Sequence, residues 1–446
     1  MATQGSVRAV LRTVVLLFLL TLCTLTVHLL RHGGNILWET PHGNAAAPVS
    51  PFLSSGPQRI TVPGDVSTAM QAYPVPAAPW GSPNTTLVET RLHAILNPWD
   101  RAYPHLTCPP PNLDRYAYLK RQFNHSQRPA YFFALNLHQC VDLLPRLIGS
   151  VVETMRFLGP HNCALSIVEG RSHDGTFEVL DALRPSMKRL GISYHFASSG
   201  VDPTAEGTDR IASLAELRNL AVRDLVLRPE HYDSNTTVVF TNDVALCMED
   251  ILELIHQRTL QGADQTCAMD WTYVGDDPTF YDVWIARGMT GDSFFEIPAS
   301  GRWDRAWDLF WNDQKAKARW ASWKPFQVFA CWNGVTAFTA KPLMEGAIAF
   351  RARREGECFQ GEPSLFAKDL WFRGHGKIAV VPSVSVGYSD DATTKIKALK
   401  GYTSSHVARE SDGILIDWDT LPPEKVKCMP NYQQQSFVAW DEGLAR

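Results

Sequence analysis

Short apolar runs alternate with helical periodicities through the middle of this chain. Runs rich in strand-forming residues cover residues 131–135, 164–168, 192–196 and 238–240. Apolar residues recur at helical spacing over residues 143–158, 177–190 and 211–227. Strands that alternate with helices of this length favour a parallel sheet with crossover helices. The pattern therefore predicts an α/β fold with a mostly parallel central sheet.

The stretch 237–255 changes from a strand pattern to a helix pattern. Its first half is apolar, and its second half places Glu249 and Asp250 in the first turn of the expected helix. Asn242 and Asp243 stand between the two halves. Open α/β sheets bind ligands at the carboxyl ends of their strands, and a carboxylate there can hold a divalent cation that holds a diphosphate. The alternative is that Asp243 only ends the strand and helps to cap the helix.

The N-terminal region contains one long apolar segment. Residues 13–30 are apolar apart from a few Thr, Cys and His side chains, and Arg8 and Arg12 precede them. This length is about the minimum for a membrane-spanning helix. A cleaved signal peptide is the rival interpretation, but no small-residue cleavage pattern follows the run directly. The sequence therefore predicts a transmembrane anchor at 13–30, with residues 1–12 in the cytoplasm.

The segment after the anchor has a different composition. Residues 31–86 are rich in Pro, Gly, Ser and Ala and lack periodicity, which predicts a flexible stem. We expect residues 87–446 to form one lumenal catalytic domain. Sequons for N-glycosylation at Asn84, Asn124 and Asn235 agree with a lumenal position.

Composition excludes some classes of partner. The 446 residues are 45% hydrophobic, so the chain can bury a large core, and the net charge of −4 gives no reason to expect a nucleic-acid partner. Of the nine cysteines, Cys23 lies in the apolar segment and eight follow it. An even number in a lumenal body permits disulfides, and no cysteine pair has the spacing of a zinc site.

Two further motifs allow both a structural and a functional interpretation. Glu169 and Asp174 follow an expected strand, where they could accept hydrogen bonds from a nucleobase or ribose, although a simple turn explains them as well. Arg218 and Asn219 lie on the expected helix 211–227. A guanidinium there could grip a diphosphate or could simply be solvated.

The order of these motifs resembles the GT-A fold of nucleotide-sugar glycosyltransferases. The second half of the chain closely resembles the fungal capsule-associated mannosyltransferases, glycosyltransferase family 69, and the similarity extends over residues 91–402. The segments that carry it are residues 280–297, 326–334, 356–366 and 377–384. The resemblance implies a Golgi type II membrane enzyme that uses GDP-mannose as donor and Mn²⁺ or Mg²⁺ as cofactor.

The resemblance also assigns roles to single residues. It makes Asp243 the metal ligand, with Asn242 beside it, although Thr241 stands where the family of folds usually has a first aspartate. Glu169, Asp174, Arg218, Asn219 and Asn242 become candidate donor-binding residues. The late histidine that many GT-A enzymes add as a metal ligand is missing.

The catalytic carboxylate is less clearly marked. Glu362 matches the acidic motif of inverting GT-A enzymes, but Pro363 stands at the position of their general base. This departure agrees with a retaining mechanism. Asp270 and Asp369 are the other catalytic candidates, and an ordinary helix-terminal role for Glu362 is the alternative.

The acceptor side is expected in the aromatic-rich second half. Trp332 is a candidate stacking platform, and the alternative is a core position. Asn333 and Asp292 complete the expected acceptor-binding residues.

The sequence thus predicts a mannosyltransferase that forms an α-1,3 bond to a mannose-containing glycan. Two alternatives remain. The first keeps the fold and uses another donor, such as xylose or glucuronate. The second is a non-catalytic protein of the secretory pathway that supports export of capsule or cell-wall polysaccharide.

Overall fold

The computed structural model describes residues 84–100, 103–121, 128–410 and 412–444. The predicted cytoplasmic tail, the anchor at 13–30 and nearly all of the stem lie outside these ranges, so these three predictions stay predictions. Among the residues that are described, no helix is both long enough and apolar enough to cross a membrane.

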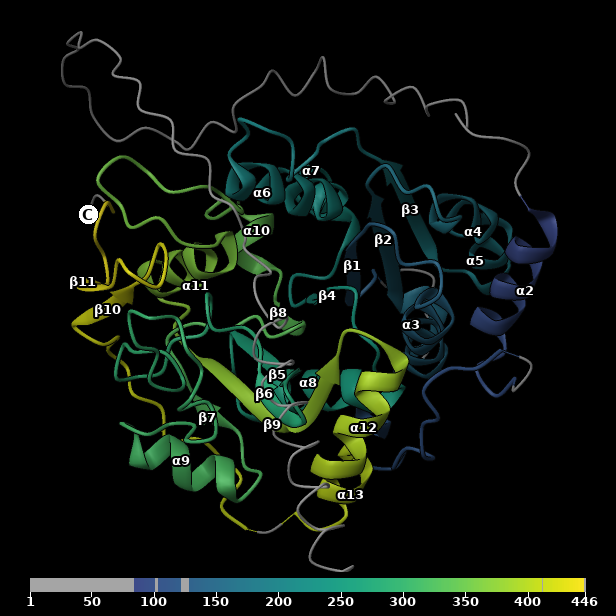
Figure 1. Ribbon diagram of the computed structural model, residues 1–446. Coiled ribbons are helices and arrows are strands. Elements are labelled where there is room, and N and C mark those ends of the chain that lie inside the picture. Colours follow the sequence, from purple (N-terminus) through teal and green to yellow (C-terminus); the bar gives the residue numbers. More distant parts are fainter. Residues whose placement is uncertain (1–83, 101–102, 122–127, 411, 445–446) are drawn as a thin grey trace, which may run out of the picture. The chain divides into compact units, whose positions relative to one another are not determined.

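A nine-stranded sheet forms the centre of the fold, in the order β3-β2-β1-β4-β8-β5-β9-β7, with β6 paired to β5 (Figure 1). Its strands are β1 (Tyr131–Leu137), β2 (Cys163–Glu169), β3 (Ser193–Ser198), β4 (Thr237–Thr241), β5 (Gln265–Val274), β6 (Asp277–Phe280), β7 (Phe326–Gln327), β8 (Val335–Thr339) and β9 (Ile378–Gly387). The four strand runs expected from the sequence are confirmed as β1 to β4. Their short apolar sequences suit strands that are covered on both faces.

The sheet is mixed. Strands β1 to β4 pair in parallel, β8 is antiparallel to both β4 and β5, and β9 is parallel to β5. Because β5 is antiparallel to β8, it runs in the same direction as β4. Six strands of the described sheet therefore run one way, and β6, β7 and β8 run the other way. The predicted predominance of parallel strands is confirmed, but the inserted antiparallel strand β8 has no counterpart in the sequence prediction.

Two layers of helices cover the sheet, and each layer has its own hydrophobic cluster. One layer contains α6 (Arg210–Ala221), α7 (Arg223–Leu227), α9 (Gln314–Ala321), α10 (Lys341–Met344) and α11 (Glu362–Phe372). The other contains α2 (Thr85–Leu96), α3 (Leu144–Leu158), α4 (Thr176–Ala182), α5 (Arg184–Leu190) and α8 (Met248–Leu260). Figure 1 shows α6, α7, α10 and α11 grouped on one side, and α2, α4 and α5 grouped on the opposite side. The remaining helices are η2 (Ala117–Leu119), η3 (Pro160–Asn162), η4 (Pro229–His231), α12 (Asp390–Lys400) and α13 (Thr403–Val407).

Two of the expected helices are each divided in two. The expected helix 177–190 becomes α4 and α5, and Pro185 near the start of α5 explains the break, because proline cannot donate the backbone hydrogen bond that would continue α4. The expected helix 211–227 becomes α6 and α7, divided at Val222.

Disulfides attach the peripheral segments to this core. Cys108 joins the N-terminal segment to Cys247 at the start of α8, and Cys358 joins the hairpin of β10 (Lys425–Cys428) and β11 (Ser436–Ala439) through Cys428. A third disulfide links Cys267 and Cys331, while Cys140 and Cys163 are buried and free. The sequence allowed for disulfides, and the structure provides their pairing.

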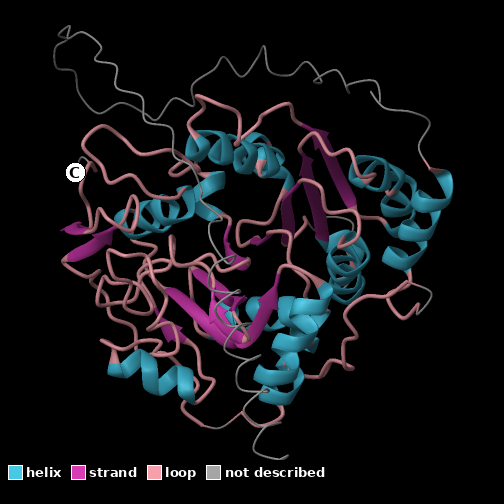
Figure 2. Cartoon of the chain, viewed as in Figure 1, coloured by secondary structure: helices cyan, strands magenta, loops and turns pink. Residues whose placement is uncertain are grey.

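A long segment without helix or strand follows β6. Residues 281–313 contain neither element and run as loops towards α9 (Figure 2). Long ordered loops of this kind are usually functional. The first residues of this segment lie at the candidate site described below.

A buried ion pair fixes the position of α12 on α8. The Nζ atom of Lys397 lies 2.8 Å from Oδ2 of Asp250, and both side chains are fully buried. The same carboxylate accepts a hydrogen bond from the backbone N–H of Cys247, 2.7 Å away, and one from the hydroxyl of Thr403. Asp250 therefore connects α8, α12 and α13.

The substitution Lys397→Met should reduce the free energy of unfolding by about 3–5 kcal/mol, because it leaves the buried carboxylate of Asp250 without its counter-charge. Denaturant unfolding with the disulfides intact measures the loss. Lys395 is exposed on the same helix, and Lys395→Met is the matched control, with an expected change within about 0.5 kcal/mol. Equal effects of the two substitutions would show that the buried pair contributes nothing specific.

Candidate active site

The carboxyl ends of the parallel strands meet at one edge of the sheet. In the strand register, Leu137 lies beside Glu169, Glu169 lies beside Ser198, and Leu135 lies beside Thr241. The loops that follow β1, β2 and β4 therefore emerge together. This is where the sequence placed the donor-binding and metal-binding residues.

Two of the predicted donor-binding carboxylates hold these loops in place. Glu169 is buried and accepts hydrogen bonds from the backbone N–H of Ser172 at 2.6 Å and from the hydroxyl of Ser198 at 3.0 Å. Asp174 accepts bonds from the backbone N–H groups of Val141, at 2.9 Å, and Thr176, at 3.0 Å. Both carboxylates shape the edge through internal bonds, and a direct contact with a nucleoside stays a prediction for each.

Arg218 and Glu362 form a buried ion pair at this edge. The Nε atom of Arg218 lies 2.7 Å from Oε1 of Glu362, and both side chains are almost fully buried. The guanidinium also lies over the ring of Trp332, 4.4 Å from its centroid, and over Phe240, at 5.0 Å. The terminal guanidinium nitrogens have no other partner among the described residues. The structure thus brings together two site residues that are 144 positions apart.

Trp332 and the two predicted asparagines of the donor site are structural neighbours of this pair. Trp332 is 1% exposed, and its indole N–H donates to Oδ1 of Asn242, 3.1 Å away. The ring supports Arg218 from within the core and does not present a face to an acceptor, so the alternative core interpretation describes its position. Asn219 exchanges two hydrogen bonds with the backbone of Phe350, at 2.8 and 3.0 Å.

The turn before β8 connects this pair to β5. Asn333 is fully buried with a positive φ of 54°, and its backbone N–H donates to Oδ2 of Asp282 at 2.9 Å. Its side-chain amide donates to the carbonyl of Ala268 at 2.8 Å. Gly334 follows with a φ of +81°, and a Cβ atom there would lie only 3.3 Å from Cβ of Asp270. Asn333 therefore holds Asp282 through its backbone, and its predicted acceptor-binding role stays a prediction.

Asp270 and Asp282 form a coupled pair of carboxyls. Asp270 is completely buried; its Oδ2 atom accepts a hydrogen bond from Tyr388 at 2.6 Å, and its Oδ1 atom has no partner among the described residues. Burial and the nearby charge of Asp282 raise the pKa of Asp270 well above its usual value. Burial likewise raises the pKa of Asp282 to about 6, against the opposing effects of the Asn333 N–H and of Arg218. Such a pair retains a proton near neutral pH.

Tyr281 lies among three aspartates of the site. Burial first, and then the negative charges of Asp270, Asp282 and Asp243, raise its pKa. Its ring also contacts the ring of Tyr388 edge to face, with centroids 4.8 Å apart. Asp243 thus belongs to the same cluster as the coupled pair.

Asp243 is the accessible carboxylate of the cluster. It is exposed to solvent, and yet partial desolvation by the surrounding protein raises its pKa, against the effect of His138. A carboxylate that is both accessible and incompletely solvated is suited to take up a cation.

The remaining predicted residues lie in other bonding networks. Asp369 accepts two hydrogen bonds from Arg351, at 2.7 and 2.8 Å, and it lies seven residues along α11 from Glu362, which corresponds to about 10 Å. Asp292 pairs with Lys427 of β10 at 3.0 Å and accepts a bond from the backbone of Ser293. The structure therefore assigns a structural position to the catalytic candidate Asp369 and to the acceptor candidate Asp292.

The donor set suits only one kind of metal site. No group of three or more His, Cys, Asp or Glu side chains within the described ranges is arranged to hold a metal ion. The side-chain oxygen of Asn242 already accepts the hydrogen bond from Trp332. A single carboxylate nevertheless fits Mg²⁺ or Mn²⁺ ions that take most of their ligands from substrate phosphates and water. Asp243 fits that role.

Sequence analysis did not assign three residues that the structure places in the cluster. Asp282 was only one of several acidic residues in the segment 280–297, and Tyr281 and Tyr388 had no assigned role. Tyr281 and Asp282 directly follow β6, and Tyr388 directly follows β9, so their positions at strand ends were the available signal.

Comparisons with known proteins identify relatives of the chain. A sequence profile for the family described as Cryptococcal mannosyltransferase 1 matches residues 130–369. The alpha-1,3-mannosyltransferase CMT1 of Cryptococcus neoformans var. neoformans is 34% identical over 397 residues, which cover 81% of this chain and 84% of that protein.

Solved glycosyltransferases align more weakly. PcManGT from Pyrobaculum calidifontis, a mannosyltransferase in complex with GDP-Man and Mn²⁺, is 11% identical over 74% of this chain and 75% of that one, with a TM-score of 0.35. GalNAc-T7 with UDP, GalNAc and Mn²⁺ is 14% identical over 59% of this chain and 44% of that one, with a TM-score of 0.36.

The coupled carboxyls should make stability depend on pH. The pKa of Asp282 is raised in the folded state, so its protonated form stabilises the fold at low pH, and this stabilisation is lost as the pH rises through about 6. Asp270→Asn removes one charge and keeps an oxygen for Tyr388. The difference in unfolding free energy between the variant and the unmodified chain should therefore shift in favour of the variant by about 1–2 kcal/mol as the pH rises from 5 to 7. Unfolding at both pH values measures this shift.

Asp276 is exposed, and Asp276→Asn should show no such shift. A stability difference for Asp270→Asn that stays constant from pH 5 to pH 7 would contradict the raised pKa values of the two carboxyls.

Proposed function

Because the chain belongs to the cryptococcal mannosyltransferase family and is a glycosyltransferase, we propose that it transfers mannose from GDP-mannose to a mannose-containing glycan and forms an α-1,3 bond with retention. The observation that carries this proposal is the convergence of Arg218, Glu362, Asp243, Asp270 and Asp282 at the carboxyl edge of the sheet. The name of the relative supports the donor sugar and the linkage.

Arg218 is the residue suited to the leaving group. The bond between the sugar and the diphosphate breaks with negative charge accumulating on the diphosphate, so fixed positive charge lowers the barrier. Glu362 holds the Nε atom of Arg218 and leaves both terminal nitrogens available for a planar, two-point contact with phosphate oxygens. Asp243 would hold a divalent cation, which would supply further positive charge to the leaving diphosphate.

The position of Pro363 supports retention. In an inverting enzyme a carboxylate removes the proton of the acceptor hydroxyl, whereas residue 363 has no side chain that could accept it. In a retaining reaction on one face, the acceptor oxygen bonds to the anomeric carbon on the side that the diphosphate leaves, and the departing phosphate oxygen takes the acceptor proton. The chain then needs to orient the two sugars. Asp270 and Asp282 can donate as well as accept hydrogen bonds for this purpose, because their raised pKa values favour the protonated carboxyl.

We also propose that the enzyme is a single-pass type II protein of the Golgi membrane. The apolar segment 13–30 and the stem at 31–86 support this topology. The disulfides of the catalytic body support a lumenal position, because disulfides persist in oxidising compartments.

The donor can be tested with the purified full chain. With Mn²⁺ and a mannobiose acceptor, GDP-mannose should support transfer, whereas nucleotide-activated xylose or glucuronate should not. The product should have an α-anomeric configuration by NMR. Asp243→Asn should lower kcat/KM by at least about 100-fold, while the exposed control Asp276→Asn should leave it unchanged. Transfer of xylose or glucuronate alone, or full activity of Asp243→Asn, would overturn the proposal.

Glu362 can be tested as the residue that orients Arg218. Glu362→Ala leaves the guanidinium of Arg218 unpaired, and it should lower kcat/KM by about 100-fold, mainly through a higher KM for the donor. Glu362→Gln keeps an oxygen for the Nε–H of Arg218 and should lose only about tenfold. Steady-state kinetics with both variants measure the difference. If both variants have activity close to that of the unmodified enzyme, Glu362 does not orient Arg218 for donor binding.

A further inference from the structure

A second cavity lies apart from the candidate active site. It has a volume of about 420 Å³ and lies between α8, the end of α9, β9, α12 and α13. This volume lies within the range of about 300–1,000 Å³ that is usual for small-molecule sites. None of Arg218, Asp243, Asp270, Asp282 and Glu362 lines it. The cavity is therefore not explained by the catalytic cluster.

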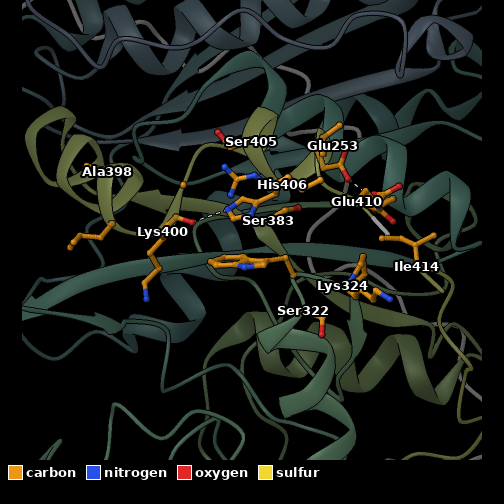
Figure 3. A pocket seen from close by; sticks show the side chains of 17 residues that line it. Glu253, Ser322, Lys324, Ser383, Ala398, Lys400, Ser405, His406, Glu410 and Ile414 are labelled. Atoms are coloured by element: carbon orange, nitrogen blue, oxygen red, sulfur yellow. Dashed lines mark hydrogen bonds between the residues drawn. The ribbon is translucent and has the colours of Figure 1, made fainter. Parts of the chain in front are cut away.

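One arginine pairs with both acidic side chains of the cavity. Glu253 and Glu410 both line it, and both bind Arg115, with nitrogen–oxygen distances of 2.9 and 2.7 Å. Figure 3 shows these two glutamates on one side of the pocket and Lys400 on the other. Because one guanidinium faces two carboxylates, the three groups together keep one negative charge.

Several polar groups of the lining remain available. The guanidinium of Arg409 makes no ion pair or hydrogen bond with any residue that the structure describes. The hydroxyls of Ser383 and Ser405, both labelled in Figure 3, likewise have no partner within the described ranges. The lining thus offers the guanidinium of Arg409 and two hydroxyls, and the ammonium groups of Lys324 and Lys400 also line the cavity without an ion pair to any described residue.

Trp323 and His406 provide a rigid aromatic wall. The two rings stack with centroids 3.9 Å apart and an angle of 27° between their planes, and Trp323 remains 36% exposed. The Nε2 atom of His406 lies 2.8 Å from the carbonyl of Lys400, which fixes the imidazole ring, and burial lowers the pKa of His406, so the ring is neutral near pH 7. Because Nε2 carries the hydrogen, Nδ1 is left as an acceptor.

The backbone of Trp323 gives an independent indication of function. Its φ angle is +57°, a left-handed conformation that is rare for a bulky residue. Strained residues of this kind collect at ligand-binding positions. The backbone thus carries an indole at a position where Asn or Gly would adopt the positive φ at a lower energetic cost.

We propose that this cavity is a second, non-catalytic carbohydrate site that holds a hexose of a long acceptor glycan. The apolar face of the sugar ring stacks on Trp323, and Arg409, Ser383, Ser405 and His406 bind its hydroxyl oxygens. The inference rests on the proposed function and adds a distal contact for the acceptor of that reaction.

The position of Lys400 connects this cavity to the catalytic cluster. Its Nζ atom lies 3.8 Å from the centroid of Trp271, the residue after Asp270. Ser383 lies four residues before Gly387 at the end of β9, which corresponds to roughly 13 Å along the strand. A glycan of several sugars covers such a distance more readily than a disaccharide.

Binding without donor tests the site independently of catalysis. The full chain would be titrated calorimetrically with a long α-mannan oligosaccharide and, separately, with mannobiose. Trp323→Asn removes the indole and tolerates a positive φ, and Arg409→Ala removes the unpaired guanidinium from an exposed position. Each should weaken binding of the long glycan about 3- to 10-fold and leave mannobiose unaffected. Trp307→Ala and Arg302→Ala are the matched controls, because both residues are strongly exposed and lie outside the cavity.

The kinetic readout separates this inference from the proposed function. Both variants should raise KM for the long acceptor by a similar factor and leave kcat and the KM for mannobiose unchanged. Long-glycan binding that depends on Trp323 and Arg409, without any transfer from GDP-mannose, would uphold the site and defeat the proposed donor. Equal affinity of the unmodified chain and both variants for the long glycan would overturn the inference. Weakening by the control substitutions to the same extent would overturn it as well.

Discussion

The buried pair of Arg218 and Glu362 links the two halves of the molecule. Arg218 lies on α6, between β3 and β4, and Glu362 begins α11, between β8 and β9. Both helices cover the same face of the sheet, and the aromatic rings of Trp332 and Phe240 fill the space beneath the guanidinium. Loss of one partner of such a pair leaves a charge in an apolar setting, which typically costs about 3–5 kcal/mol. The pair therefore holds together the halves of the sheet that the donor and acceptor would contact.

The region around this ion pair contains more acidic side chains than basic ones. Asp270, Asp282 and Asp243 surround Tyr281, and Arg218 is the positive group closest to Glu362. Two of these carboxyls have strongly raised pKa values, and Asp270 keeps one oxygen without a partner. Uncompensated carboxylates are unfavourable in a resting fold, but they suit a site that receives a cation and sugar hydroxyls. The electrostatics thus agree with the family relationship.

The local parts of the fold could be predicted, whereas the contacts between distant segments could not. The strands β1 to β4 and the helices between them follow from apolar periodicity, and Asp243 was expected at a strand end because it follows the run 238–240. The ion pair between Arg218 and Glu362 joins residues 144 positions apart, and no local pattern reports it. The position of Trp332 could not be predicted either. An aromatic residue in a turn can face solvent or the core, and the contact with the distant Arg218 shows that Trp332 faces the core. Asp369 shares a helix with Glu362 but binds Arg351, and helical spacing alone could not distinguish these roles.

The most direct test of the catalytic assignment is the binding of GDP to the full chain, measured by calorimetry with and without Mn²⁺. We expect tight binding that requires Mn²⁺, that is lost in Asp243→Asn and that is weakened in Arg218→Lys, since lysine lacks the planar two-point contact with phosphate. GDP binding of equal affinity with and without Mn²⁺, unchanged in both variants, would contradict the placement of the diphosphate between Asp243 and Arg218.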